Sequence, residues 1–280
     1  MLFSYSAIND FSNIISVSGS IDANEQVEIR SEVSGIVENI YFKEGAIVTK
    51  GQTLFKVNDI ELRAELAQAV TKRNLASENE RRAKLLLEKE AISQEEYDIA
   101  SADYRTAKAQ TQLIQAQIGK TTIRAPFSGK IGLRNISPGT YVTPTTLISK
   151  LVSSNPLKIT FSIPEKYASE INKNTEIKFT VPNISETFKA KIYAIEPEIE
   201  TTTRTLKIRA LAENSSGKLL PGTFANIELP LKNIQDAILI PTEAIIPVQE
   251  GKKVFISENG KAKSVKVETL TRLQVQKRLK

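Results

Sequence analysis

Two long stretches of this sequence place apolar residues three or four positions apart, which is the spacing of an amphipathic helix. The first begins at residue 60 and ends near residue 90, and Arg73 and Glu80 interrupt its stripe. The second extends from about Gln94 to Ile118. The two stripes consist of Leu62, Leu66, Ala69, Ala76, Ala83 and Leu87, and of Tyr97, Ala100, Tyr104, Ala107, Thr111, Ile114 and Ile118. This heptad spacing predicts two antiparallel helices packed along a narrow seam.

The signals between and after the two stretches predict where the helices begin and end. Ser93 followed by Glu96 is a capping box at the start of the second helix, so Ala91 and Ile92 form the tip of the hairpin. Gly119 is expected to end the second helix as a C-cap. Because the apolar stripes are narrow, we expect the hairpin to project into solvent. The alternative, a pair of helices lying on a sheet, would require a wider apolar stripe.

A 17-residue pattern occurs on both sides of this hairpin, at residues 33–49 and 127–143. Each copy reads as strand, turn and strand, with turn dipeptides between the apolar runs. At a constant offset of 94 the identical pairs are Ser34/Ser128, Gly35/Gly129, Gly45/Gly139, Val48/Val142 and Thr49/Thr143. Two copies are too few for a solenoid and indicate two similar β units that face each other. The second copy is expected to be one residue shorter before its next strand.

After a predicted linker at residues 153–156, apolar and polar residues alternate strongly from Leu157 onward. Short strands at this spacing predict a small antiparallel barrel. A short helix is expected at 165–172 within it. The expected strands are 157–164, 176–181, 187–195, 205–212 and 223–229, followed by a last β segment with strands at 237–240, 253–257 and 262–270.

Composition removes several classes of function. The chain of 280 residues has no Cys and no His, and its only Met is Met1. A Cys nucleophile, a His general base and a Cys/His zinc site are therefore excluded, and a soft-metal site has no ligands in the body of the chain. The net charge of +6 is mild and aromatic residues make up 6%. We expect no nucleic-acid partner, because such a protein more often shows a concentrated basic face or a stacking platform.

The segment from Glu44 to Leu54 resembles the turn pattern of biotinyl and lipoyl carrier domains. In those carriers a lysine on the following tight turn holds the cofactor. Glu61 stands at that position here, and a helix begins in place of the hairpin. We therefore expect the lipoyl scaffold without a carrier lysine, and hence no bound cofactor. Because Cys and His are absent, we also expect no metal site and no catalytic residues.

A split lipoyl domain with an inserted helical hairpin is similar to the periplasmic adaptors, or membrane fusion proteins, of tripartite efflux pumps of the resistance–nodulation–division (RND) type. The segments 156–165, 203–210, 220–227 and 240–246 resemble the barrel strands and the entry to the membrane-proximal domain of that family. The implied fold is mainly β with an inserted α-helical coiled-coil hairpin, in an elongated multi-domain chain. The resemblance covers about residues 14 to 270.

The resemblance also implies the domain boundaries. They are 26–59 with 119–153 for a split lipoyl (barrel-sandwich hybrid) domain, 60–118 for the hairpin, 154–235 for the β-barrel, and 14–25 with 236–280 for a membrane-proximal domain. The family's usual closing segment of Gly-Leu and Gly-Asp turns is absent after Leu270, so we expect the last domain to be incomplete.

Members of this family are not enzymes. They bridge an inner-membrane transporter and an outer-membrane duct, which implies these two partners and self-association as a trimer of dimers or a hexamer. The implied location is the periplasm, anchored to or associated with the inner membrane. No lipidation Cys, signal peptide or apolar run of membrane length is visible, so we expect any anchor or export segment to lie outside this sequence, and the mode of membrane attachment stays open.

One short motif of the RND adaptors matches residue by residue: an Arg, a Leu four positions later and a Ser seven positions after that. These are Arg82, Leu86 and Ser93. The resemblance implies that they contact the duct from the hairpin tip. Arg offers a planar fork of donors to carbonyl groups. The alternative is a solvated Arg, a seam Leu and an ordinary N-cap Ser.

Three other functions remain as alternatives. The first is an adaptor for an ATP-driven exporter or for type I secretion, although the predicted hairpin is short for the haemolysin-type systems. The second is a biotinyl or lipoyl carrier, which the missing lysine disfavours. The third is a glycan-acting enzyme that uses Glu196 and Glu198, which lie in a charged turn that contains a proline.

Overall fold

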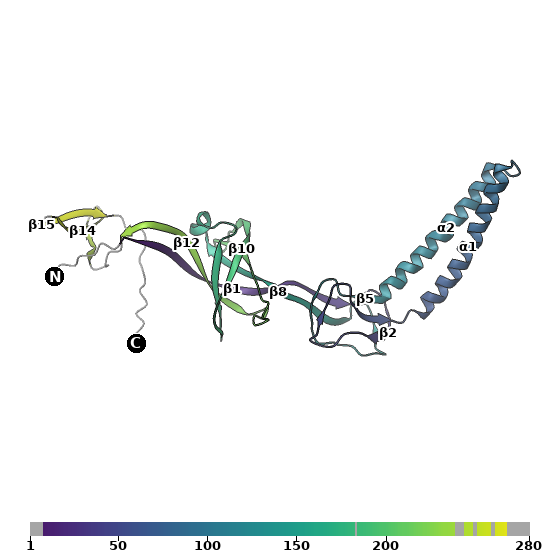
Figure 1. Cartoon of the computed structure of the whole chain (residues 1–280), viewed down its shortest axis with the longest axis horizontal. Coiled ribbons are helices and arrows are strands. Elements are labelled where there is room, and N and C mark those ends of the chain that lie inside the picture. Colours follow the sequence, from purple (N-terminus) through teal and green to yellow (C-terminus); the bar gives the residue numbers. More distant parts are fainter. Residues whose placement is uncertain (1–7, 183, 239–243, 249–250, 259–260, 268–280) are drawn as a thin grey trace.

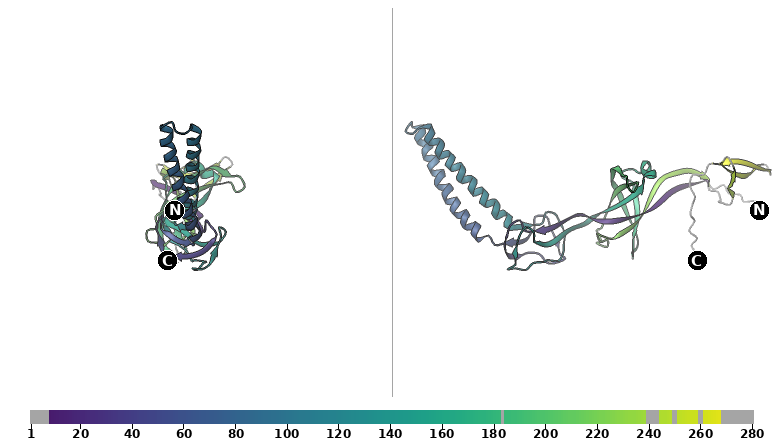
Figure 2. Two further views of the ribbon diagram at one scale, coloured as in Figure 1. Left: turned by 90° about the vertical axis from the view of Figure 1, so that its right-hand side faces the viewer. Right: turned by 180° about the vertical axis from the view of Figure 1, so that it is seen from behind.

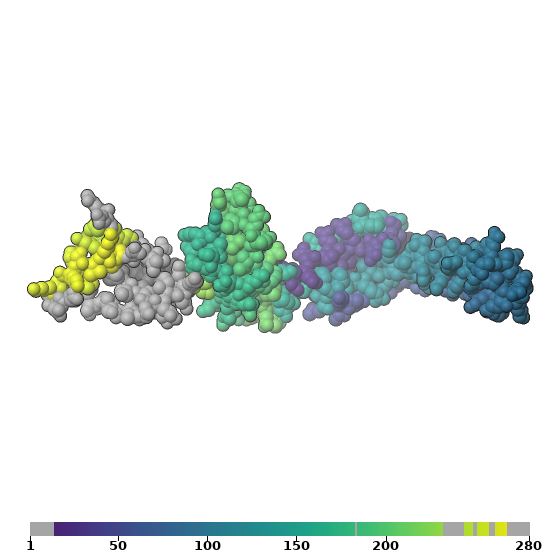
Figure 3. Space-filling view, turned by 90° about the horizontal axis from the view of Figure 1, so that it is seen from above, coloured from purple at the N-terminus to yellow at the C-terminus, as the bar shows by residue number. Residues whose placement is uncertain are grey.

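The computed structural model describes residues 8–182, 184–238, 244–248, 251–258 and 261–267. The chain is elongated, with a helical hairpin at one end, a three-stranded sheet at the other and two β units between them (Figure 1). A view from above shows these parts following one another along the long axis (Figure 3). The predicted fold class, mainly β with an inserted helical hairpin, is confirmed.

The hairpin helices lie in the first half of the chain, and strands dominate the second half. The first half contains β1 (Ile8–Arg30), β2 (Gly35–Ile40), β3 (Ile47–Val48), β4 (Thr53–Val57), α1 (Ile60–Glu88), α2 (Gln94–Thr121), β5 (Thr122–Arg124), β6 (Gly129–Ile131) and β7 (Tyr141–Val142). The second half contains β8 (Leu147–Pro164), the 3-10 helix η1 (Glu165–Glu170), β9 (Glu176–Val181), β10 (Ile184–Glu200), β11 (Thr205–Ala212), β12 (Phe224–Ile238), β13 (Ile246–Val248), β14 (Gly251–Glu258) and β15 (Lys261–Val267).

The two helices pack along the predicted seam and project from the β units (Figure 2). Every predicted seam position is buried or half-buried, and Ala69, Ala107 and Ile114 are the most buried apolar residues. The two polar residues that interrupt the sequence pattern also lie half-buried along the seam. One of them, Glu80, accepts a hydrogen bond from the Tyr97 hydroxyl across the hairpin at 3.2 Å. At Glu80 the stripe is thus continued by a polar pair that joins the two helices.

The prediction that Gly119 ends the second helix is wrong. Helix α2 continues to Thr121, whose Oγ1 donates to the carbonyl of Ile118 at 2.7 Å, and the N–H of Thr122 donates to the carbonyl of Gly119. Strand β5 then begins at once. The helix therefore ends where its backbone enters the sheet, with no glycine in the left-handed conformation.

The two copies of the repeat form one β unit in which each copy contributes a strand to each pairing. Gly35 of β2 lies opposite Val142 of β7, and Val48 of β3 lies opposite Gly129 of β6. An offset of 94 converts one pair into the other, so the copies exchange places about an approximate two-fold axis. A Cβ at Gly129 would lie 2.5 Å from the carbonyl oxygen of Val152, which explains the glycine at this position.

Backbone hydrogen bonds in the turns repeat the same relation. The N–H of Val37 donates to the carbonyl of Thr140 at 2.9 Å, and the N–H of Ile131 donates to the carbonyl of Ala46 at the same distance. The predicted facing arrangement of two similar units is therefore confirmed. Their apolar side chains enclose one core between the two sheets.

The expectation that the second copy is one residue shorter is wrong. The N–H of Tyr41 donates to the carbonyl of Leu54, and the N–H of Asn135 donates to the carbonyl of Ile148, at the same offset of 94. Residues 144–145 therefore form a turn as long as its counterpart in the first copy. The difference in sequence changes the residues of the turn but not its length.

The barrel is a closed sheet in the order β1-β12-β9-β10-β11-β8, with β8 pairing back to β1. Alternate side chains point inward, as β11 illustrates with Leu206, Ile208 and Ala210 buried between exposed Lys207 and Arg209. The bounds of β9 and β11 are those predicted. The short helix predicted at 165–172 is the 3-10 helix η1, which is two residues shorter.

Two predictions around the barrel are wrong in part. The expected linker at 153–156 lies within the continuous strand β8, which pairs with β1 on both sides of this segment. Part of 14–25 lies in the barrel rather than in a membrane-proximal domain, because Ile21 is fully buried in the barrel core and Ile15 and Val17 pack against it. Parts of the predicted strands at 237–240 and 262–270, and of the segment 240–246, lie outside the described residues.

Candidate functional site

The tip of the hairpin is a short loop whose backbone is fixed at both ends. On the α1 side, the N–H of Ala91 donates to the carbonyl of Leu86 at 2.9 Å, and Glu90 adopts a φ of 59°. On the α2 side, Ser93 Oγ accepts from the N–H of Glu96 at 3.2 Å, and the Ser93 N–H donates to Glu96 Oε2 at 3.0 Å. The predicted capping box is confirmed, and it satisfies backbone donors at the start of α2.

Glu78 holds two neighbouring arginines below the tip, and it holds them differently. Arg81 binds the carboxylate in a bidentate manner, with Nε to Oε2 at 2.9 Å and Nη2 to Oε1 at 2.8 Å. Arg82 binds through Nε alone, at 2.9 Å to Oε1. The hydrogen bonds from Arg81 have the largest effect and that from Arg82 the next, and together they lower the pKa of Glu78 to about 2. The carboxylate of Glu78 therefore stays charged near neutral pH. Within the described part of the chain, the Arg82 guanidinium makes no other hydrogen bond, so its two terminal nitrogens have no partner there.

Two of the three predicted tip residues lie on α1 and the third lies at the start of α2. Arg82 and Leu86 lie one turn apart on the same face of α1, with 66% of the Arg82 side chain and 44% of Leu86 exposed. Ser93 lies beyond the loop at the start of α2, and it is also exposed. All three face solvent near one end of the molecule, and their contact with a duct remains a prediction.

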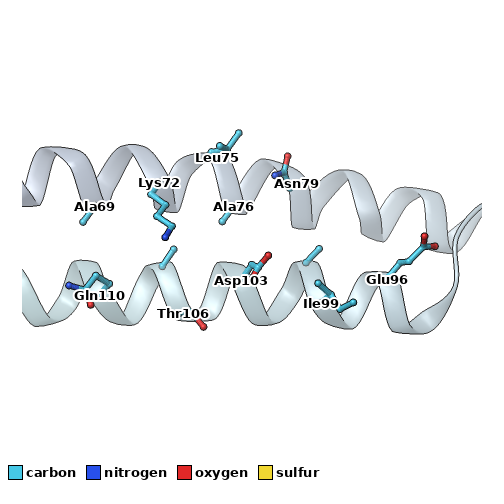
Figure 4. Close-up of a pocket in the computed structure, with 12 residues that line it drawn as sticks. Ala69, Lys72, Leu75, Ala76, Asn79, Glu96, Ile99, Asp103, Thr106 and Gln110 are labelled. Carbon is cyan, nitrogen blue, oxygen red and sulfur yellow. The ribbon is translucent and has the colours of Figure 1, made fainter.

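A groove of about 660 Å³ lies between the helices below the tip, and the sequence pattern does not predict it. Small residues of the seam, such as Ala69 and Ala76, leave space between the two backbones (Figure 4). Lys72 extends from α1 toward α2 across this space (Figure 4). Leu75 and Ile99 line the groove and are exposed by 63% and 58%. The sequence does contain a signal for this groove: Leu75 and Ile99 are large apolar residues outside the seam spacing, and the stripe pattern takes no account of them.

The base of α1 is joined to the β unit by an ionic cluster. Asp59, only 5% exposed, accepts from Arg63 Nε at 2.9 Å through Oδ1, which also lies 3.2 Å from Lys56 Nζ. Lys56 in turn binds Glu38 of β2 at 2.7 Å. The hydrogen bond from Arg63 and then that from Lys56 lower the pKa of Asp59 against the opposing effect of burial. The cluster fixes the first turn of the helix against β2 and β4.

The structure places Glu61, at the position of a carrier lysine, in the first turn of α1. This helical position differs from the tight turn that presents the lysine in carrier domains. Within the described ranges, no cluster of three or more His, Cys, Asp or Glu residues has the arrangement of a metal site.

The comparisons with known proteins agree with this arrangement. Residues 25–153 match the family described as the barrel-sandwich hybrid domain of RND membrane fusion proteins, and residues 157–232 match the CusB-like β-barrel domain. The chain belongs to the RND membrane fusion proteins. In this membrane fusion protein the two matched regions correspond to the two β units, and the helical hairpin is an insertion within the first.

Relatives of the chain include the multidrug resistance protein MdtA of Proteus mirabilis, which is 26% identical over 94% of this chain and 70% of that protein. MdtA of Pectobacterium atrosepticum is 28% identical over 86% of this chain and 64% of that protein. The chain thus spans about two thirds of the length of these relatives.

Solved structures share the fold. A MacA–MexA chimeric protein that contains the Pseudomonas aeruginosa MexA α-hairpin aligns with a TM-score of 0.76 at 22% identity, over 93% of this chain and 95% of that chain. MacA from Actinobacillus actinomycetemcomitans aligns with a TM-score of 0.63 at 20% identity, over 98% and 94%. Among the described helices of the membrane fusion protein, none is long and apolar enough to span a bilayer.

Proposed function

We propose that this chain is the periplasmic adaptor subunit of a tripartite multidrug efflux system. In this role it bridges a proton-driven RND transporter of the inner membrane and a duct of the outer membrane, and it is not an enzyme. The observation that carries the proposal is the placement of a solvent-exposed helical tip at one end of an elongated RND membrane fusion protein. The curated MdtA relatives, which are named multidrug resistance proteins, support multidrug export.

In this proposal each part of the chain has one partner. The hairpin tip contacts the duct through Arg82, Leu86 and Ser93, while the β units associate with further copies, as a trimer of dimers or a hexamer. The barrel and the domain after it face the transporter at the inner membrane. The free terminal nitrogens of the Arg82 guanidinium suit carbonyl groups at the ends of duct helices, because Arg presents several donors in one plane. Leu86 adds a dry apolar contact one turn away.

An adaptor for an ATP-driven exporter is the second candidate. The solved structures of the fold include MacA, but their low identity shows the fold alone. The description of the barrel-sandwich hybrid family names the RND class, which favours the proton-driven partner. A carrier function is disfavoured by Glu61 at the lysine position.

A drug-accumulation assay with Arg82→Ala tests the proposal. In cells that lack the native gene, the full-length exported protein is expected to restore low ethidium accumulation, whereas the variant restores little of it. The reason is that the variant removes the free donors at the tip. Ethidium fluorescence per cell, at matched protein levels, is the measurement.

Arg81→Ala is the matched control, since Arg81 binds the same carboxylate but uses two of its nitrogens for it. This variant is expected to export normally. Full export by Arg82→Ala, or equal loss in both variants, would contradict the assignment of Arg82 to the duct contact. Failure of the unmodified protein to restore export would contradict the adaptor role itself.

A further inference from the structure

Two strands, β1 and β8, run as a ribbon from the barrel into the β unit formed by the two repeat copies, which we call the repeat unit (Figure 1). Strand β8 pairs with β6 of the repeat unit as far as Val152 and with β11 of the barrel from Leu157 onward. The buried apolar side chains form two separate cores, one in each unit. The angle between the units therefore depends on the short joint between these two residues.

The ribbon is bulged at this joint. Ala23 of β1 lies opposite Leu157, and the next pair is Glu25 with Ser153. Three residues of β8, 154–156, thus face a single residue of β1, and we call these three residues the bulge. A bulge bends the longer strand and increases its local twist. Because two paired strands have little stability of their own, a contact from outside the ribbon decides whether the joint keeps one angle.

Asn214, in the loop that follows β11, supplies such a contact. Its N–H donates to Asn155 Oδ1 at 2.9 Å, and its Nδ2 donates to the carbonyl of Ser154 at 3.0 Å. On the barrel side, Nδ2 also donates to the carbonyl of Leu219 at 2.9 Å, and Oδ1 accepts from the Leu219 N–H at 3.1 Å. Asn214 therefore bonds to the bulge and to the barrel at once. We call these four hydrogen bonds the clasp.

The centre of the clasp is buried, and it uses both the donors and the acceptor of the Asn214 amide. Asn214 is 5% exposed, and Leu219 is 2% exposed within the barrel core. An amide carries two N–H donors and a carbonyl acceptor in one plane, which is what these partners require. A carboxylate lacks the donors, and an aliphatic side chain lacks both. Loss of the amide is costly, because the groups left behind are buried without a partner.

The loop that carries Asn214 is also bound to the other strand of the ribbon. At its far end, the N–H of Gly222 donates to the carbonyl of Ile21 at 2.7 Å, and the N–H of Ile21 donates to the carbonyl of Thr223 at 2.9 Å. Ile21 belongs to β1 and is fully buried in the barrel core. The loop thus binds β8 at its beginning and β1 at its end, so the clasp ties the bulge to a fixed part of the barrel.

We propose that the clasp is a lock that sets the angle between the barrel and the repeat unit. While it is formed, the bulge keeps one bend and the hairpin keeps the direction seen in Figure 2. Once it is released, the ribbon at the joint is free to bend and twist. Asn214 is a positioning residue, because it acts on the hairpin through the ribbon. This inference goes beyond the adaptor role, since it concerns two units of one chain and requires neither an exporter nor a duct.

Distances between pairs of spin labels, measured by electron paramagnetic resonance, test the proposal on the 280-residue chain, which has no Cys of its own. Labels on Lys130→Cys with Lys207→Cys span the joint, and labels on Lys178→Cys with Lys207→Cys lie within the barrel. All three lysines are exposed strand residues. With an intact clasp, each pair is expected to give one narrow distance distribution.

Two variants each remove one hydrogen bond that crosses the joint. Asn155→Ala removes the acceptor of the Asn214 N–H, and Asn214→Asp removes the donor to the Ser154 carbonyl. Each variant is expected to raise the ratio of released to clasped molecules about fivefold, and the two together about 25-fold. The distribution across the joint should broaden accordingly, while the distribution within the barrel stays narrow.

Asn135→Ala is the matched control, because Asn135 is an exposed residue whose Nδ2 donates to the carbonyl of Leu147 at 3.5 Å within the repeat unit. This variant should leave both distributions unchanged. A broad distribution across the joint with an intact clasp would overturn the proposal, and so would an unchanged one in both clasp variants. If Asn214→Asp also broadens the distribution within the barrel, Asn155→Ala decides alone, since residue 155 is exposed and an unchanged joint in that variant overturns the lock.

Discussion

At the scale of single residues, the joint between hairpin and β unit depends most on Asp59. Its carboxylate is almost fully buried, and Oδ1 accepts from Arg63 and Lys56 while Oδ2 has no hydrogen-bond partner. A buried charge is tolerated only where it is paired, and here both partners lie within 3.2 Å. The second leg of the hairpin needs no such cluster, because α2 continues directly into β5.

Replacing Asp59 by Asn is expected to destabilise the base of α1 by roughly 1–3 kcal/mol at pH 7, because two cationic donors lose their charged acceptor. The pKa of Asp59 is lowered in the folded protein, so its stabilising effect is present above the unfolded pKa and lost as the pH falls through the folded value. The difference between the two proteins should therefore shrink below about pH 4. Helix melting followed by circular dichroism at pH 7 and pH 3 measures it.

Glu61→Gln is the matched control, since it removes one carboxylate from the same turn of α1 at an exposed site. Its effect should stay within about 0.5 kcal/mol. An Asp59→Asn protein as stable as the unmodified chain at pH 7 would show that the cluster does not hold the joint.

At the scale of elements, the hairpin and the repeat are the parts that the sequence predicts best. Heptad spacing identifies both helices because packing of two helices imposes that period on the residues between them. The same signal cannot show how a polar pair is accommodated, so Glu80 interrupts the pattern in the sequence although it bonds to Tyr97 across the seam. The capping box is predictable because its two hydrogen bonds are local.

Long-range pairing accounts for the errors. The segment 153–156 contains the residues of a linker, yet β1 pairs with β8 on both sides of it and keeps it extended. Likewise glycine is common at helix ends, but α2 does not end at Gly119. It ends where Thr122 enters β5. The groove beside Leu75 and Ile99 is also missed, since the space depends on how closely the two backbones approach.

The cap at the tip can be separated from any role of Ser93 in docking. Ser93→Ala is expected to cost about 1 kcal/mol locally and to speed amide exchange at Glu96, whose N–H loses its acceptor. Ser93→Asp keeps an N-cap acceptor and should keep the exchange slow. Hydrogen exchange of the first turn of α2 is the measurement, and slow exchange in the alanine variant would contradict the role of the cap.

At the scale of the whole molecule, the proposed adaptor role depends on polarity along the long axis. The exposed helical tip lies at one end and the small basic sheet at the other, with the two β units between them (Figure 1). The closed barrel and the continuous strands β1 and β8 connect these units without a loose linker. A chain of this form suits a subunit that spans the distance between two membrane partners.

Site-specific crosslinking tests this role most directly, and the absence of Cys from these 280 residues means that no other thiol of this region competes with the introduced one. Single cysteines replace Ser93 at the tip and Ser257 in β14, in the full-length exported protein. The adaptor role predicts a crosslink to an outer-membrane duct from position 93 and none from position 257. A protein that is exported and folded but gives no duct crosslink from position 93, or gives one only from position 257, would contradict it.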